Sequence, residues 1–177
     1  MLHKLENRAE VEHSSVGMKL WLGWVGLSVA VGLAYFLTAQ LGLALLTTAE
    51  RVAVFWPASG IAVGILIALG GWARGPVAAG VIVATLAANL MADRSVWSAL
   101  AFGLCNAAEA LLAIWLIERW FGPALSLDSL RRVLRFFAAA AVAAATAAVG
   151  AAGAMKLFGP STAAFLDVWE VWFASDA

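Results

Sequence analysis

The chain has 177 residues, of which 64% are hydrophobic and 12% are charged. A soluble globular domain is nearer to half apolar, so this composition excludes an ordinary soluble protein and indicates a membrane protein. Eleven basic and eleven acidic residues give a formal net charge of zero, which offers no overall field to attract nucleic acid. The single cysteine, Cys105, excludes an intrachain disulfide.

Long apolar stretches recur along the chain, each almost free of charged residues. A helix needs roughly 20 predominantly apolar residues to cross the hydrocarbon core of a bilayer, and continuous apolar runs are typical of helices rather than of barrel strands. The sequence therefore predicts an all-α, polytopic transmembrane helical bundle with five spans and an incomplete sixth segment. We expect spans at about 20–46, 54–70, 76–91, 97–117 and 133–155, and the partial segment at 165–177.

Residues 1–19 precede the first span as a polar tail of mixed charge. The span itself is longer than the core of a secretory signal, which is roughly 7 to 15 residues, so we expect it to be retained. If the tail is cytoplasmic and each run crosses once, eight of the eleven Lys and Arg residues lie on the inner side, and only Arg51, Arg94 and Lys156 lie outside. This distribution satisfies the positive-inside rule and predicts a cytoplasmic amino terminus.

The start of the second span has a distinctive sequence, Trp56-Pro57-Ala58-Ser59-Gly60. Proline suits the first position of a helix, so we expect the regular helix to begin at Pro57, with its first amide donors near the outer face. Such a helix end attracts anions, and helices broken at membrane depth often mark binding sites; Arg51 would add positive charge there. A simple helix start, with Trp56 as an interfacial anchor, accounts for the same residues and is the simpler interpretation.

A few polar residues lie inside the spans. Glu109 is well inside the fourth span, where an ionised group costs on the order of 2.5 to 3.5 kcal/mol. Asn106 lies three residues earlier and projects from the same helix face. The two residues form either a polar sensing pocket or a hydrogen-bonded contact with a neighbouring helix. Gln40 and Asn89 allow the same two interpretations, of which an interhelical hydrogen bond is the simpler, and all four residues are candidates to converge inside the bundle.

The last segment, Phe165 to Ala177, contains Trp169, Trp172 and Asp176. It is too short to cross a bilayer, and it stops in mid-pattern. Either its end lies in the membrane interface, where tryptophan is favoured, or the chain is a fragment of a longer protein. We favour the fragment.

Several motifs resemble, in order and spacing, the first membrane-associated sensor family, a group of bacterial integral-membrane sensory domains. The resemblance runs from about Tyr35 to the last residue. It is carried by Trp56-Pro57-Ala58-Ser59-Gly60-Ile61-Ala62, Leu69-Gly70, Asn89, Asn106 with Glu109-Ala110-Leu111-Leu112, and Trp169 to Trp172 with Asp176.

The resemblance implies that residues 20–177 form a multi-pass sensory domain of the bacterial inner membrane. Members of the family usually precede a cytoplasmic histidine kinase, diguanylate cyclase or phosphodiesterase domain. They also continue past the Trp-rich segment into further apolar helices, so the resemblance implies that this chain is truncated at its C-terminal end.

From the residues and the resemblance together we expect a membrane-embedded sensory input module of a histidine kinase or cyclic-di-GMP enzyme. A ligand, lipid or partner protein that binds one arrangement of the helices better than another would alter the attached output. A small-molecule transporter or transporter subunit, and a passive membrane anchor, are the alternatives. The candidate sensing residues are Arg51, Trp56, Pro57, Ser59, Asn89, Asn106, Glu109, Trp169, Trp172 and Asp176.

The sequence contains no Gly-rich phosphate loop, metal cluster or nucleophile elbow. We therefore expect no catalytic residue, no metal site and no cofactor in this chain. The expected partners are the lipid bilayer and a cytoplasmic output domain, with a second copy of the chain or another membrane protein as further candidates and no nucleic acid.

Overall fold

The computed structural model describes residues 2–44, 55–122, 125–158 and 164–177, and it describes their side chains except for those of residues 2–16 and 19. Within these residues every regular element is helical, which confirms the expected all-α class. The elements are α1 (Leu2–Ala44), α2 (Pro57–Leu69), the 3-10 turn η1 (Gly71–Ala73), α3 (Arg74–Met91), α4 (Val96–Phe121), α5 (Leu130–Phe158) and α6 (Phe165–Asp176).

Four of the helical stretches are long and apolar enough to cross a membrane, namely Leu20–Ala44, Gly71–Met91, Val96–Phe121 and Leu130–Phe158. The expected second span is α2, which has only 13 residues. A helix of this length is about 20 Å long, shorter than the hydrocarbon core of about 30 Å. The multi-helix membrane architecture is therefore found, whereas a fifth full-length span stays a prediction.

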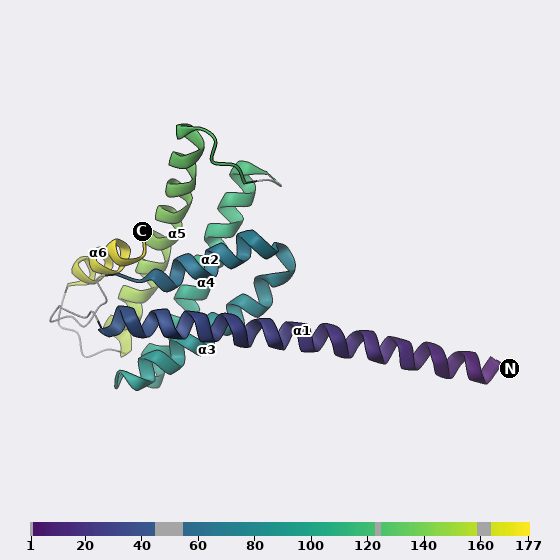
Figure 1. Cartoon of the computed structure of the whole chain (residues 1–177). Coiled ribbons are helices and arrows are strands. Elements are labelled where there is room, and N and C mark those ends of the chain that lie inside the picture. Colours follow the sequence, from purple (N-terminus) through teal and green to yellow (C-terminus); the bar gives the residue numbers. More distant parts are fainter. Residues whose placement is uncertain (1, 45–54, 123–124, 159–163) are drawn as a thin grey trace.

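Each long helix packs against the next long helix of the chain (Figure 1). The main contacts join α1 to α3, α3 to α4, and α4 to α5, while α2 lies against α1 and α4 and the short α6 folds back onto α5. In Figure 1 the amino-terminal part of α1 projects well beyond the other helices. The segment 2–19, expected as a tail before the first span, thus continues the first helix.

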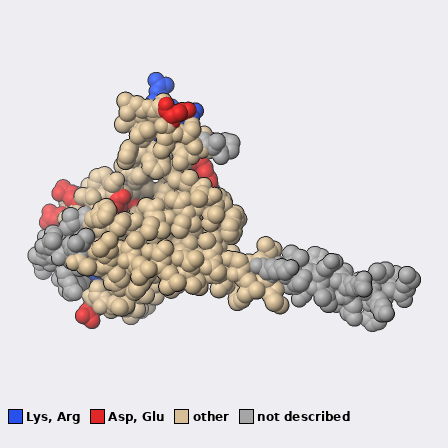
Figure 2. All heavy atoms as spheres, in the orientation of Figure 1, with Lys and Arg blue, Asp and Glu red and all other residues tan. Residues whose placement is uncertain are grey.

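Charged side chains lie mainly at the ends of the helices. Figure 2 shows a broad uncharged surface over the bundle, with Lys and Arg side chains gathered at the tip where α4 leads into α5. The exposed residues Asp128, Arg131, Arg132 and Arg135 lie in this region of the chain. The uncharged band between charged ends is the surface that a lipid bilayer requires.

The helices α1 and α3 approach each other closely at Gly32 and Gly80. A Cβ atom on Gly80 would lie 2.6 Å from the carbonyl oxygen of Ser28 and 3.0 Å from the backbone nitrogen of Gly32. Both neighbours are backbone atoms, so neither can move without shifting its helix. The contact between α1 and α3 therefore requires glycine at position 80.

We predict that Gly80→Ala lowers the free energy of unfolding by about 1 to 3 kcal/mol, because the added methyl group forces the two helices apart. Gly64→Ala in α2 is the matched control, since a Cβ there would meet nothing within 4 Å. The control should leave stability unchanged or raise it by up to about 1 kcal/mol. Equilibrium unfolding in mixed detergent micelles measures the free energy of unfolding of both variants. Equal destabilisation by Gly80→Ala and Gly64→Ala would contradict the close contact between α1 and α3.

Candidate functional site

Polar side chains from five helices meet inside the bundle and form one group, here called the polar cluster. Its members on α1, α3 and α4 are buried, and those on α2 and α6 complete it from the other side. The cluster therefore joins helices that are far apart in the sequence. Its members are Tyr35, Trp56, Ser59, Thr85, Asn89, Asn106, Glu109, Trp172 and Asp176.

Hydrogen bonds between helices hold the buried half of the cluster together. Trp56 Nε1 donates to Tyr35 Oη at 3.0 Å, which ties α2 to α1. Asn106 Nδ2 donates to Thr85 Oγ1 at 3.3 Å, which ties α4 to α3. Asn89 Nδ2 instead bonds the carbonyl oxygen of Thr85 within its own helix, at 2.9 Å. Two of these three bonds thus join neighbouring helices and the third lies within α3, and each satisfies a polar group that is buried away from water.

An acidic side chain of α6, that of Asp176, contacts the start of α2. Pro57 is the first helical residue, with Trp56 as its N-cap, so the position expected for the helix start is confirmed. Ser59 Oγ lies at hydrogen-bonding distance, 3.5 Å, from Asp176 Oδ1, and the backbone nitrogen of Trp56 donates to the carbonyl oxygen of Ser175 at 3.0 Å. The positive end of the α2 dipole therefore meets a carboxyl group of the same chain, the charge that such a helix end favours.

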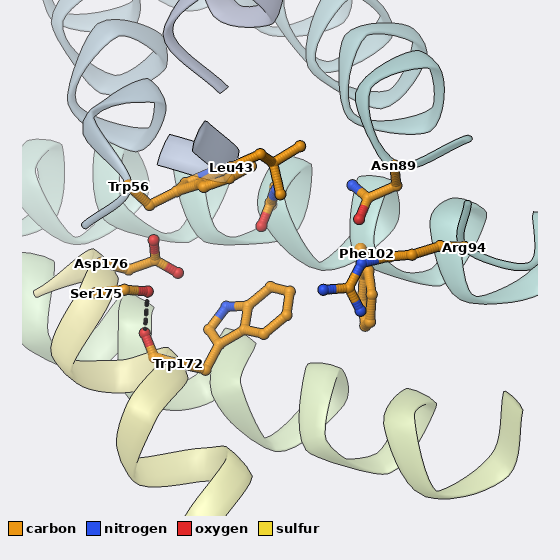
Figure 3. Close-up of a pocket in the computed structure, with 9 residues that line it drawn as sticks. Leu43, Trp56, Asn89, Arg94, Phe102, Trp172, Ser175 and Asp176 are labelled. Atoms are coloured by element: carbon orange, nitrogen blue, oxygen red, sulfur yellow. Dashed lines mark hydrogen bonds between the residues drawn. The ribbon is translucent and has the colours of Figure 1, made fainter. Parts of the chain in front are cut away.

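A small pocket of about 30 Å³ opens beside this contact, which is room for about two water molecules. Figure 3 shows Trp172 and Asp176 on one side of the pocket, facing Asn89 and Arg94 across it. Leu43, Trp56, Phe102, Asn106 and Ser175 line the rest.

Three buried polar atoms around the pocket have no hydrogen-bond partner among the described residues. They are Asn106 Oδ1, Trp172 Nε1 and Asp176 Oδ2. A buried polar atom without a partner costs about 1 to 3 kcal/mol. The two oxygens and the indole N–H can therefore bind a small polar molecule, the oxygens accepting hydrogen bonds and the indole donating one.

Arg94 supplies positive charge on the side opposite Asp176. Its guanidinium carbon lies 5.4 Å from the centre of the Phe102 ring, within the range of a cation–π contact. The turn before α4 places it there: Asp93 has a φ of 57°, and Ser95 caps α4 by accepting a hydrogen bond from the Ser98 backbone nitrogen at 3.1 Å. The pocket thus offers a cation, a carboxyl group, amides and aromatic rings within one small volume.

The profile of the membrane-associated sensor domain 1 (MASE1) family matches residues 27–177. The chain belongs to the MASE1 family. No curated protein and no solved structure matches it significantly.

MASE1 is a membrane sensory domain found in signalling proteins and is not itself catalytic. The matched range contains every residue of the polar cluster. The resemblance seen in the sequence is therefore confirmed at the level of the family.

The structure of this MASE1 domain places some of the residues expected from the sequence at the pocket and others away from it. It brings Trp56, Asn89, Asn106, Trp172 and Asp176 together around the pocket. Ser59 and Glu109 lie beside it, and Glu109 interacts electrostatically with Asp176. Pro57 is the first residue of α2, so its role is structural.

Three other residues lie elsewhere. Gln40 does not join the polar cluster; its Nε2 is 3.6 Å from Met91 Sδ at a partly exposed site. Trp169 does not line the pocket, because its Nε1 donates to the carbonyl oxygen of Ala145 at 3.0 Å and holds α6 on α5. Arg51 lies outside the described residues.

Sequence reasoning missed several members of the site, which are Tyr35, Leu43, Thr85, Arg94, Phe102 and Ser175. Thr85 and Phe102 each lie four residues before a recognised asparagine, so helical spacing places them on the same face. Tyr35 is the only tyrosine in the chain, and a hydroxyl inside an apolar span is itself a signal. For Arg94 the sequence had no signal, because it was assigned to an outer loop.

We predict that Trp169→Phe loosens the attachment of α6 to α5, because phenylalanine cannot make the hydrogen bond to Ala145. The stacking on Phe173, at 5.2 Å between ring centroids, is retained, so the variant tests the hydrogen bond alone. One hydrogen bond is worth about 1 kcal/mol, so the amides of α6 should exchange with deuterium about fivefold faster. Trp115→Phe is the control, since Trp115 is 54% exposed and should leave the exchange unchanged. Identical exchange in the two variants would show that this bond does not hold α6.

Proposed function

We propose that this MASE1 domain is the sensory input module of a bacterial inner-membrane signalling protein whose output is a histidine kinase or a cyclic-di-GMP enzyme. In this proposal a small polar ligand binds in the pocket of the polar cluster, and the position of α6 reports the binding to the output. The observation that carries the proposal is that the short helix α6 supplies one wall of the pocket, through Trp172, Ser175 and Asp176.

The helix α6 is short and packs on α5 and against the start of α2, so its position depends on a limited set of side chains. It has 12 residues, of which only Val168 is fully buried. Its remaining described contacts include the Trp169 bond to α5, the Asp176 and Ser175 contacts to the start of α2 and the packing of Trp172 on Phe102, at 4.9 Å between ring centroids. A helix held in this way can dock and undock at modest free-energy cost.

A ligand in the pocket would bind the docked arrangement preferentially. Trp172 Nε1 and Asp176 Oδ2 reach the pocket only while α6 is docked, whereas Asn106 belongs to the fixed part of the bundle. Two hydrogen bonds of about 1 kcal/mol each, made only in the docked arrangement, would shift the equilibrium about 30-fold. This difference in affinity is what a sensory relay needs, because a ligand that binds both arrangements equally transmits nothing.

We predict that Asp176→Asn changes the basal activity of an attached output about tenfold, because it alters the contact between α6 and the start of α2 by about 1.4 kcal/mol. Glu170→Gln, an exposed position on the same helix, is the matched control and should have no effect. Cyclase or kinase turnover of the chain joined to its output domain, in nanodiscs, measures both variants.

The same variants separate the alternatives. A passive anchor predicts that Asp176→Asn changes thermal stability and leaves the activity of the output unaltered. A transporter predicts that the chain alone carries a solute into proteoliposomes. Either result would overturn the sensory proposal.

The proposed relay also requires that the output side be cytoplasmic, which the positive-inside rule predicts. In a Cys105→Ser background, Val96→Cys at the start of α4 should react with a membrane-impermeant maleimide in intact spheroplasts. Ser129→Cys, just before α5, should react only after lysis. Labelling of Ser129→Cys in intact spheroplasts would reverse the proposed orientation.

A further inference from the structure

The first two turns of α5 carry three exposed arginines, Arg131, Arg132 and Arg135, at the tip where Figure 2 shows basic side chains gathered. Arg132 is paired within the chain, because its Nη1 atom lies 3.2 Å from each carboxyl oxygen of Asp128. The guanidinium groups of Arg131 and Arg135 have no hydrogen-bond or ion-pair partner among the residues that the structure describes. Two positive charges are therefore left without an acidic partner.

The placement of these two charges is unfavourable for the helix. Arg131 and Arg135 are four residues apart, so they lie on the same face one turn apart, and like charges at this spacing repel. Arg131 also lies in the first turn of α5, where the positive end of the helix dipole disfavours a cation, and this turn contains no acidic residue. An anion that contacts both guanidinium groups would offset both effects.

The length of α5 places the two arginines at the level of the lipid headgroups. The helix has 29 residues and is therefore about 43 Å long. A bilayer is about 40 to 45 Å thick when its headgroup regions are included. A membrane helix of this length reaches the headgroups at both ends, so Arg131 and Arg135 lie where the phosphate groups of the lipids are.

Below the arginines, the same face of α5 is apolar and exposed. The spacing of Arg131, Arg135, Ala138 and Val142 keeps them on one side of the helix, and Leu134 lies beside them. Leu134 is 59% exposed and Val142 is 46% exposed, and Ala138 is exposed too. Two unpaired cations are thus followed, toward the middle of the membrane, by a continuous apolar surface.

We propose that this face of α5 binds an anionic phospholipid, whose phosphate group contacts Arg131 and Arg135 and whose acyl chain lies along Leu134, Ala138 and Val142. Guanidinium groups bond phosphate oxygens in pairs, and each arginine near an anionic headgroup strengthens binding roughly fivefold. A zwitterionic lipid brings a cation of its own to the two arginines and gains less. An acidic protein segment matches the charges, but it has no acyl chain to cover the apolar surface below them.

The test measures the affinity of the chain in detergent micelles for phosphatidylglycerol, which is anionic, and for phosphatidylcholine, which is zwitterionic. Both lipids carry the same acyl chains, and native mass spectrometry counts the bound molecules. The proposal predicts that phosphatidylglycerol binds about 30-fold more tightly, from two arginines at roughly fivefold each. Inorganic phosphate at the same concentration should not displace it, because a free anion makes no contact with the apolar surface.

Arg131→Gln combined with Arg135→Gln should bring the affinities for the two lipids together. Both side chains are exposed, so the double variant should fold normally, which its helix content by circular dichroism checks. Arg132→Gln is the matched control in the same turn of α5. Because Arg132 is already paired with Asp128, this variant should keep most of the preference for phosphatidylglycerol.

Three results would overturn the proposal. Equal affinity of the unaltered chain for the two lipids would show that headgroup charge is not recognised. An equal loss in Arg132→Gln and in the double variant would show a general effect of charge in place of a site at Arg131 and Arg135. Displacement by inorganic phosphate would assign the arginines to a free anion. The measurements need no output domain, so their outcome is independent of the sensory role of the polar cluster.

Discussion

A polar side chain inside a lipid-embedded bundle must find its partner within the protein, because neither lipid nor a dry interior supplies one. In this chain that requirement determines where the helices meet. Tyr35 on α1 accepts from Trp56 before α2, and Thr85 on α3 accepts from Asn106 on α4. Close packing of small residues, as at Gly32 and Gly80, brings the helices together. The polar pairs select one register because any other would leave buried groups without partners.

The same requirement gives α6 its importance. This short helix brings Asp176 to the start of α2, across 117 residues of sequence, and so combines a carboxyl group with a helix dipole that needs one. Among the residues that the structure describes, Trp172 Nε1 and Asp176 Oδ2 have no hydrogen-bond partner, and neither does the nearby Asn106 Oδ1. In this cluster some polar groups are hydrogen-bonded and others have no partner among the described residues. Such a cluster is suited to a sensory domain, because a ligand can bond the groups that have no partner. The role of MASE1 domains in signalling proteins agrees with this arrangement.

Much of this architecture could be predicted from local sequence. Apolar length predicted the long helices, and the proline rule predicted that α2 begins at Pro57. The cost of burying amides predicted that Asn89 and Asn106 converge. The same reasoning predicted that Gln40 joins them, but Gln40 lies outside the cluster. Local pattern could not separate them, since the outcome depends on which face of α1 packs against α3. Nor could it pair Ser59 with Asp176, because a contact between the start of one helix and the end of another depends on the whole fold.

The most direct test of the central claim is whether α6 meets the start of α2 inside a real membrane. Ser59→Cys and Asp176→Cys, combined in a Cys105→Ser background, can be joined in native membranes by a short bifunctional thiol reagent. The account predicts rapid intramolecular cross-linking of this pair and none when Cys replaces the exposed Glu170 instead of Asp176. Absence of cross-linking at positions 59 and 176, or equal cross-linking of both pairs, would contradict a polar cluster completed by α6.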